Sequence, residues 1–292
     1  MKDLTVIVPV FNEEASIEAL LVNIKEKIVP TGASIIFVND GSTDNSKALL
    51  KVEVSKQISL VNHKVNRGYG GAIKSGILAS KTPYVITFDA DNQHDINDIP
   101  KLYEQIKIQD ADMVVGKRKS YRESNFKRLG KWIIRRLVNT LFPLKVSDIN
   151  SGIKIYRSDI AVKNLEFCPD SMAFSDVILL MFVSQRHLVT EMEVTCFERN
   201  SGQSKVGLNS AINTFFEILS VVLLFNPLKI FLPVSFICFL FGSIWGAFMI
   251  MQGNGLSVAA LLALLISVLL LLIGLVANQL RNISKALINF KV

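Results

Sequence analysis

Two long segments near the end of this chain restrict its fold more than any other feature of the sequence. Residues 230–251 and 256–280 contain no Asp, Glu, Lys or Arg. Each segment exceeds the roughly 20 residues that a helix needs to cross the hydrocarbon core of a bilayer. A short polar turn, residues 252–255, separates them. The pattern predicts a transmembrane helical hairpin, which also accounts for the high mean hydropathy of +0.38.

Basic residues at the ends of this hairpin predict its orientation. Lys229 precedes the first segment, and Arg281, Lys285 and Lys291 follow the second, while the turn has no basic residue. Loops on the cytoplasmic side of a membrane are enriched in Lys and Arg. We therefore expect both ends of the hairpin, and the domain before it, to lie in the cytoplasm at the cell membrane.

The residues before the hairpin include two stretches that fit a membrane surface. Residues 208–228 are rich in Phe and Leu and are expected to lie along the interface as an amphipathic helix. Residues 117–136 are strongly basic, with apolar side chains at helical spacing; a packed surface helix with a solvated charged face would give the same pattern. We expect three parts: a cytoplasmic domain (1–207), an interfacial segment (208–228), and the hairpin with a cytoplasmic tail (229–292).

The first part alternates short apolar runs with helical patterns. The apolar runs, rich in β-branched residues, are residues 4–10, 34–38, 58–61, 84–88 and 113–116. Strands separated by single helices predict an α/β fold with a mostly parallel sheet and helices on both faces. Ligands bind such sheets at the carboxyl ends of the strands. Asn12, Asp40 and Asp89 follow three of these ends, so their side chains are expected to converge.

Asp89-Ala90-Asp91 is the strongest candidate for chemistry. The two carboxylates follow a buried strand, and an acidic side chain there is costly without a partner. Mg²⁺ and Mn²⁺ are commonly shared between one or two carboxylates and the phosphates of a substrate. A calcium loop beginning at Asp89 would need Gly and Glu where His94 and Pro100 stand. We favour a Mg²⁺ or Mn²⁺ site, with a helix-capping role for Asp91 as the alternative.

Net charge and glycine spacing limit the choice of anionic partner. The formal charge of +7 suits phosphorylated substrates, anionic lipid or nucleic acid. No nucleic-acid partner is expected, because the basic residues gather beside the membrane elements without an aromatic stacking pattern. Gly68, Gly70, Gly71 and Gly76 match neither a dinucleotide fingerprint nor a P-loop. Arg67, at the start of this loop, could still hold a diphosphate or a ribose.

Seven short motifs follow one another along the first 205 residues. They are VPVFNE (8–13), NDGSTD (39–44), NRGYGGA (66–72), DADNQH (89–94), GKR (116–118), DINSG (148–152) and RNSGQSK (199–205). In this order they resemble the motifs of family 2 glycosyltransferases of the GT-A fold. The similarity is to the branch of dolichol-phosphate mannose synthases and bacterial polyprenyl-phosphate glycosyltransferases, and the paired C-terminal spans match the bacterial two-helix members.

The resemblance implies a role for individual positions in the site. The nucleotide pocket would be lined by Pro9, Asn12, Glu13, Asp40 and Arg67. Asp89 and Asp91 would hold a metal on the donor diphosphate, and Asp91, Arg118 and Asp148 would form the catalytic group. Phosphate groups of donor and acceptor would be contacted by Gln93, Arg128, Arg199 and Lys205. Asp148 could act as a base, or instead pair with Arg135 or Arg136.

The resemblance also implies an activity. The expected enzyme is inverting and metal-dependent, and transfers one sugar from a nucleotide-sugar donor to polyprenyl phosphate at the cytoplasmic membrane face. UDP-glucose or UDP-N-acetylglucosamine and undecaprenyl phosphate are favoured, with a GDP-mannose-dependent dolichyl-phosphate enzyme as the alternative. A processive polysaccharide synthase and a non-catalytic membrane scaffold rank lower. Gly242 and Gly246 could pack membrane helices closely, and small spans often associate, so a homo-oligomer is also considered.

Overall fold

The chain consists of two compact units. The computed structural model describes residues 1–118, 146–197, 227–255 and 257–290. The first unit is Met1–Ile218 and the second is Leu219–Val292. The basic segment 117–136 beyond Arg118, and all but the last two residues of the expected interfacial segment 208–228, lie outside the described residues.

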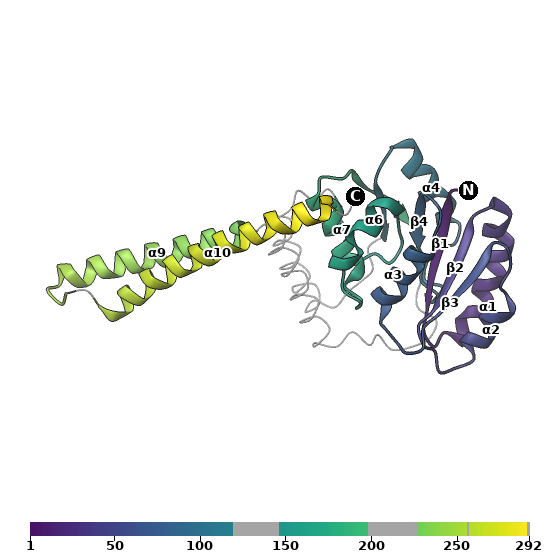
Figure 1. Ribbon diagram of the computed structural model, residues 1–292, viewed down its shortest axis with the longest axis horizontal. Helices are drawn as coiled ribbons and strands as arrows, with labels where there is room; N and C mark the ends of the chain where they lie inside the picture. Colours follow the sequence, from purple (N-terminus) through teal and green to yellow (C-terminus); the bar gives the residue numbers. More distant parts are fainter. Residues whose placement is uncertain (119–145, 198–226, 256, 291–292) are drawn as a thin grey trace. The chain divides into compact units, whose positions relative to one another are not determined.

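A seven-stranded sheet lies at the centre of the first unit, in the order β3-β2-β1-β4-β6-β5-β7. Figure 1 labels the first four strands of this order, β3, β2, β1 and β4. The predicted, mostly parallel sheet is confirmed: only the pairings of β6 with β4 and with β5 are antiparallel. The strands are β1 Leu4–Val10, β2 Ser34–Asn39, β3 Ile58–Asn62, β4 Tyr84–Thr87, β5 Met113–Arg118, β6 Lys154–Arg157 and β7 Val189–Val194. The sequence analysis predicted the first five strands and missed β6 and β7.

Helices cover both faces of this sheet, because its central strands are apolar on both sides. Every residue of β1 is buried. Val6 and Val8 belong to one core cluster with Ile17 of α1 and Leu102 of α4, whereas Ile7 points to the opposite face under α3. The helices of this unit are α1 Glu14–Asn23, α2 Ser46–Val52, α3 Tyr69–Ala79, α4 Asp98–Ile108, α6 Ser158–Asn164 and α7 Phe174–Ser184, with helical turns at Ile24–Ile28, Val29–Thr31 and Leu165–Phe167.

The reversed strand β6 determines what reaches the carboxyl edge of the sheet. Its first residue, Lys154, pairs with Thr87 at the end of β4 and with Val115 of β5. Because β6 runs antiparallel to both neighbours, the residues that precede it lie at the edge where β4 and β5 end. The segment 148–152 is therefore brought beside the residues that follow β4.

Two apolar helices make up the second unit, as the sequence predicts. They are α9, Leu228–Met251, and α10, Val258–Phe290, and both are long and apolar enough to cross a membrane. Gly242 packs against Leu264 of α10, and Ser235 Oγ donates a hydrogen bond of 2.9 Å to Ser267 O. Gly242 thus allows a close contact between the two helices of the hairpin. Most of their remaining apolar side chains are exposed, as lipid-facing residues would be.

We expect Gly76→Ala to destabilise the first unit, because Gly76 lets α3 approach the sheet closely. A Cβ there would overlap Ile7 Cγ2 and lie 3.3 Å from Val38 Cγ2. Overpacking costs about 1–3 kcal/mol, which outweighs the gain of about 1 kcal/mol in helix propensity. The melting temperature should fall by about 2–4 °C per kcal/mol of net loss. Leu78→Ala, on the exposed side of α3, should change stability by less than about 0.5 kcal/mol. Equal melting temperatures for the two variants would contradict this account.

Candidate functional site

The candidate site lies where β4, β5 and the start of β6 meet at the carboxyl edge of the sheet. Asp89 follows β4, Arg118 ends β5, and Asp148 stands in the segment before β6. Arg118 Nε lies 2.8 Å from Asp148 Oδ2, and the negative charges of Asp148 and Asp89 both raise the pKa of Arg118, so the three groups lie close enough to interact. The fold therefore brings together three residues that the sequence analysis had placed in one site.

Asp89 is held on both oxygens by its surroundings. The Tyr69 hydroxyl donates a hydrogen bond of 2.9 Å to Asp89 Oδ1. Gly152 packs against Asp89 Oδ2 so closely that a Cβ at that position would overlap the carboxylate. Burial raises the pKa of Asp89, and this effect exceeds the opposing influence of Tyr69, Lys154 and Arg118. Burial thus disfavours the ionised form of Asp89, and a bound cation would favour that form.

The turn after Asp89 directs Asp91 and Gln93 by backbone contacts. Asp91 Oδ1 accepts a hydrogen bond of 3.1 Å from the Gln93 amide. Asn92 has a φ of 56°, and its side chain donates to Ser16 O at 3.0 Å. Within the described residues, no group of three or more His, Cys, Asp or Glu side chains is placed to hold a metal. Asp89 and Asp91 could supply two carboxylates, with the remaining ligands from elsewhere.

Arg118 and Asp148 form a two-pronged ion pair. Arg118 Nε donates to Asp148 Oδ2 at 2.8 Å and Nη2 donates to Oδ1 at 3.0 Å, while the Arg118 amide donates to Oδ2 at 3.2 Å. Burial alone would raise the pKa of Asp148, but the hydrogen bonds and the charge of Arg118 outweigh it and hold that pKa below its ordinary value. Asp148 is therefore an ionised partner for Arg118. Arg118 supplies the guanidinium among the described residues; Arg135 and Arg136, the partners considered from the sequence, lie outside them.

A second group of predicted residues follows β1 and β2. Asn12 adopts a φ of 55° and accepts a hydrogen bond from the Thr43 amide at 2.8 Å. Asp40 is buried and accepts hydrogen bonds from the backbone amides of Arg67 and Gly68, each at 2.9 Å. Asp40 thus fixes the start of the glycine-rich loop, while the Arg67 side chain is exposed. The predicted nucleotide contacts of Pro9, Asn12, Glu13, Asp40 and Arg67 remain predictions.

The sequence analysis gave no role to three residues that contribute to these contacts. His63 lies between Asp40 Oδ1 (2.6 Å) and Ser75 Oγ (2.8 Å), and no sequence signal joined these distant positions. Tyr69 could have been suspected only from its place in the glycine-rich loop. Lys154 is buried, and burial lowers its pKa to about 8. His94, in the motif that begins at Asp89, is buried, and its Nδ1 has no hydrogen-bond partner among the described residues. Arg128, Arg199 and Lys205 lie outside the described residues.

We expect Arg118→Met to destabilise the protein in a pH-dependent manner. Without Arg118, burial would raise the pKa of Asp148 above its unfolded value, so that the ionised carboxylate opposes folding. The loss of stability should be largest near about pH 7 and smaller near about pH 4, where Asp148 in the variant takes up a proton. Arg157→Met, which breaks an exposed pair with Asp159, should have a small effect at both pH values. The melting temperatures of the two variants at each of the two pH values measure the difference. A loss of stability in Arg118→Met that does not depend on pH would contradict this expectation.

Family models match both units of the chain. The model described as glycosyl transferase family 2 matches residues 5–165. The model described as GtrB C-terminal hairpin matches residues 226–283, which includes α9 and most of α10.

Related proteins include several polyprenyl-phosphate sugar transferases. Dodecaprenyl-phosphate galacturonate synthase of Rhizobium johnstonii is 28% identical over 75% of this chain and 66% of its own length. Undecaprenyl-phosphate 4-deoxy-4-formamido-L-arabinose transferase of Aeromonas hydrophila is 31% identical over 75% of this chain and 68% of its own length. The transferase of the same name from Pseudomonas aeruginosa is 30% identical over 94% of this chain and 84% of its own length.

Solved structures share the fold at low identity. Glucosyl-3-phosphoglycerate synthase from Mycobacterium tuberculosis, in complex with Mg²⁺ and UDP, matches with a TM-score of 0.61 and 19% identity over 75% of this chain and 79% of that one. Staphylococcus aureus TarS in complex with UDP-GlcNAc matches with a TM-score of 0.57 and 17% identity over 76% of this chain and 66% of that one. The family model and the relatives together establish that this chain belongs to glycosyl transferase family 2.

Proposed function

We propose that this glycosyltransferase transfers a single sugar from a nucleotide-sugar donor to polyprenyl phosphate at the cytoplasmic face of the cell membrane. The observation that carries the proposal is the gathering of Asp89, Arg118 and Asp148 at one sheet edge, in a chain that also has an apolar hairpin. Relatives whose names specify polyprenyl-phosphate acceptors support the choice of acceptor. The basic residues that flank the apolar helices support the cytoplasmic side.

We assign a divalent cation, Mg²⁺ or Mn²⁺, to Asp89 and Asp91. The two carboxylates offer the hard oxygen ligands that these ions prefer. The desolvation that raises the pKa of Asp89 fits a carboxylate that a cation would stabilise, and the lack of a Cβ at Gly152 leaves room for that carboxylate. A bound cation would stabilise the leaving nucleoside diphosphate as a Lewis acid. Similar folds solved with Mg²⁺ or Mn²⁺ and UDP agree with this assignment.

Asp148 serves in this proposal as an anchor for Arg118 and not as a base. A carboxylate whose pKa is held low by two guanidinium hydrogen bonds is a weak proton acceptor. A phosphate acceptor is already anionic and needs no strong base. Arg118, oriented by Asp148, would face the phosphate oxygens, for which a guanidinium is suited. Attack on the anomeric carbon in line with the leaving group would invert its configuration, with rate acceleration from positioning and charge stabilisation.

The donor and the lipid are the finer parts of the proposal. We favour UDP-glucose or UDP-N-acetylglucosamine with undecaprenyl phosphate, and retain GDP-mannose with dolichyl phosphate as the alternative. Relatives named for galacturonate and for 4-deoxy-4-formamido-L-arabinose add these sugars to the donors worth testing.

Asp89→Asn and Asp91→Asn should each lower turnover by about a hundredfold or more, the scale on which lost charge stabilisation lowers kcat. Each change keeps the side-chain shape but removes the charge that would hold the cation. Asp110→Asn is a matched control, because Asp110 is exposed after α4 and away from the sheet edge. Turnover of all three variants is measured as the release of nucleoside diphosphate by detergent-purified protein. Near-normal turnover in either site variant, with a folded protein, would remove the metal role.

Release of nucleoside diphosphate should require both the divalent cation and the lipid phosphate. The assay combines UDP-glucose, UDP-N-acetylglucosamine, GDP-mannose and a UDP-galacturonate donor with Mg²⁺ or Mn²⁺, with and without undecaprenyl phosphate. One donor should give release that depends on the lipid. Release that is indifferent to the lipid would point to another acceptor, and metal-dependent binding of donors without release would favour a non-catalytic scaffold.

A further inference from the structure

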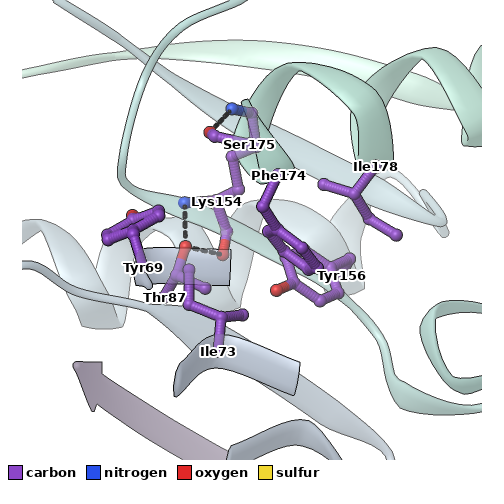
Figure 2. Close-up of a pocket in the computed structure, with 8 residues that line it drawn as sticks. All are labelled: Tyr69, Ile73, Thr87, Lys154, Tyr156, Phe174, Ser175 and Ile178. Atoms are coloured by element: carbon purple, nitrogen blue, oxygen red, sulfur yellow. Dashed lines mark hydrogen bonds between the residues drawn. The ribbon is translucent and has the colours of Figure 1, made fainter. Parts of the chain in front are cut away.

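Lys154 is a buried lysine whose ammonium group is fully used within the protein. Its side chain is 1% exposed at the first position of β6. Nζ donates to Ile149 O at 3.0 Å and to Ser151 O at 2.5 Å. It also donates to Ser175 Oγ, a contact that Figure 2 shows. An ammonium has three donors and no acceptor, so these contacts employ all of its hydrogen-bonding capacity.

The three acceptors connect one loop to a helix. Ile149 and Ser151 belong to the segment 148–152, and Ser175 lies in the first turn of α7. Ser175 Oγ also donates to Ser151 O at 2.6 Å. From the other side, Thr87 Oγ1 at the end of β4 donates to Gly152 O at 2.6 Å. Lys154 is thus the cross-link between the segment 148–152, β6 and α7.

This segment carries two contacts of the candidate site. Asp148 orients the Arg118 guanidinium, and Gly152 packs against the Asp89 carboxylate. A shift of the segment would move both together. The position of the Lys154 ammonium therefore affects both the Arg118 guanidinium and the Asp89 carboxylate, although Lys154 itself lies beneath the site.

The charge of Lys154 is a second way in which this residue affects the site. Burying an ammonium is costly, and burial lowers the pKa of Lys154 to about 8, against the favourable influence of Asp176, Asp148 and Asp89. An apolar residue would fill this position without that cost. The retained positive charge offsets the negative charge of the neighbouring carboxylates, Asp89 among them.

We propose that Lys154 is a positioning residue that holds the segment 148–152 in place. In that position Asp148 orients the Arg118 guanidinium, and Gly152 packs against the Asp89 carboxylate. The positive charge of Lys154 also weakens the binding of a cation by Asp89 and Asp91. The inference rests on the proposed function for its consequence in catalysis. Its two physical parts, the restraint of the segment and the effect on cation affinity, can be measured without turnover.

The test compares four variants of the full chain in detergent. Lys154→Met removes the donors and the charge, Lys154→Arg keeps the charge but not the geometry, and Ser175→Ala removes one acceptor. Tyr156→Phe is the control in the same pocket, because the Tyr156 hydroxyl is buried without a hydrogen-bond partner among the described residues. The readouts are hydrogen exchange of the peptide covering residues 147–153, the Kd for Mn²⁺ with and without UDP, and kcat for the active donor.

We expect hydrogen exchange in residues 147–153 to rise about tenfold or more in Lys154→Met, and less in Ser175→Ala, because open states become more populated when anchors are lost. Mn²⁺ should bind Lys154→Met about threefold or more tightly, since a nearby positive charge is gone, while kcat falls. Lys154→Arg should show the faster exchange and lower kcat without tighter Mn²⁺ binding. Tyr156→Phe should match the unchanged protein in all three.

Unchanged exchange in a folded Lys154→Met variant would overturn the positioning role, and unchanged Mn²⁺ affinity would overturn the charge role. If Lys154→Met does not fold, Lys154→Arg and Ser175→Ala decide the positioning role by exchange. If the unchanged protein releases no nucleoside diphosphate from any donor, the proposed function fails, while the exchange measurement still decides whether Lys154 restrains the segment.

Discussion

The rest of the site depends on the contacts that stabilise the Asp89 carboxylate at the half-buried end of β4. Asp89 loses solvation there, and burial raises its pKa in spite of every favourable neighbour. Tyr69 supplies a hydrogen bond from the glycine-rich loop, and Gly152 gives the space that any larger residue would fill. These contacts come from three different parts of the chain, so the carboxylate is in place only when β4, α3 and the segment before β6 are all assembled.

Reversal of a single strand makes that assembly possible. In a wholly parallel sheet, the residues before a strand lie at the edge opposite to the one where its neighbours end. Because β6 is antiparallel to β4 and β5, the segment 148–152 reaches the carboxyl edge directly, with no further connection. Arg118, at the end of β5, then meets Asp148 through two hydrogen bonds. The pair links neighbouring parts of the site and leaves the carboxylate ionised.

The sequence was sufficient for features that depend on local pattern. Buried parallel strands are continuous apolar runs, which made β1 readable, and the spacing of Ile17, Leu20 and Leu21 predicted α1. The four residues of β6 begin and end with basic side chains, so no strand pattern is visible there. His63 meets Asp40 only through the register of β3 on β2, which no local pattern encodes. Lys154 resembles a surface lysine until its three acceptors are known.

The balance of fixed charge explains why such a site would need a mobile cation. Among the described residues, Asp89, Asp91 and Asp148 are acidic, while Arg118 and Lys154 are the basic groups that influence the pKa values of Asp89 and Asp148. Arg118 is engaged by Asp148, and the Lys154 ammonium is directed at two carbonyls and a hydroxyl. The Lys154 ammonium therefore has no donor left for an incoming diphosphate, whereas Arg118 keeps three of its five N–H donors. A divalent cation shared by Asp89, Asp91 and the diphosphate would supply the missing positive charge at the point where the leaving group becomes more negative.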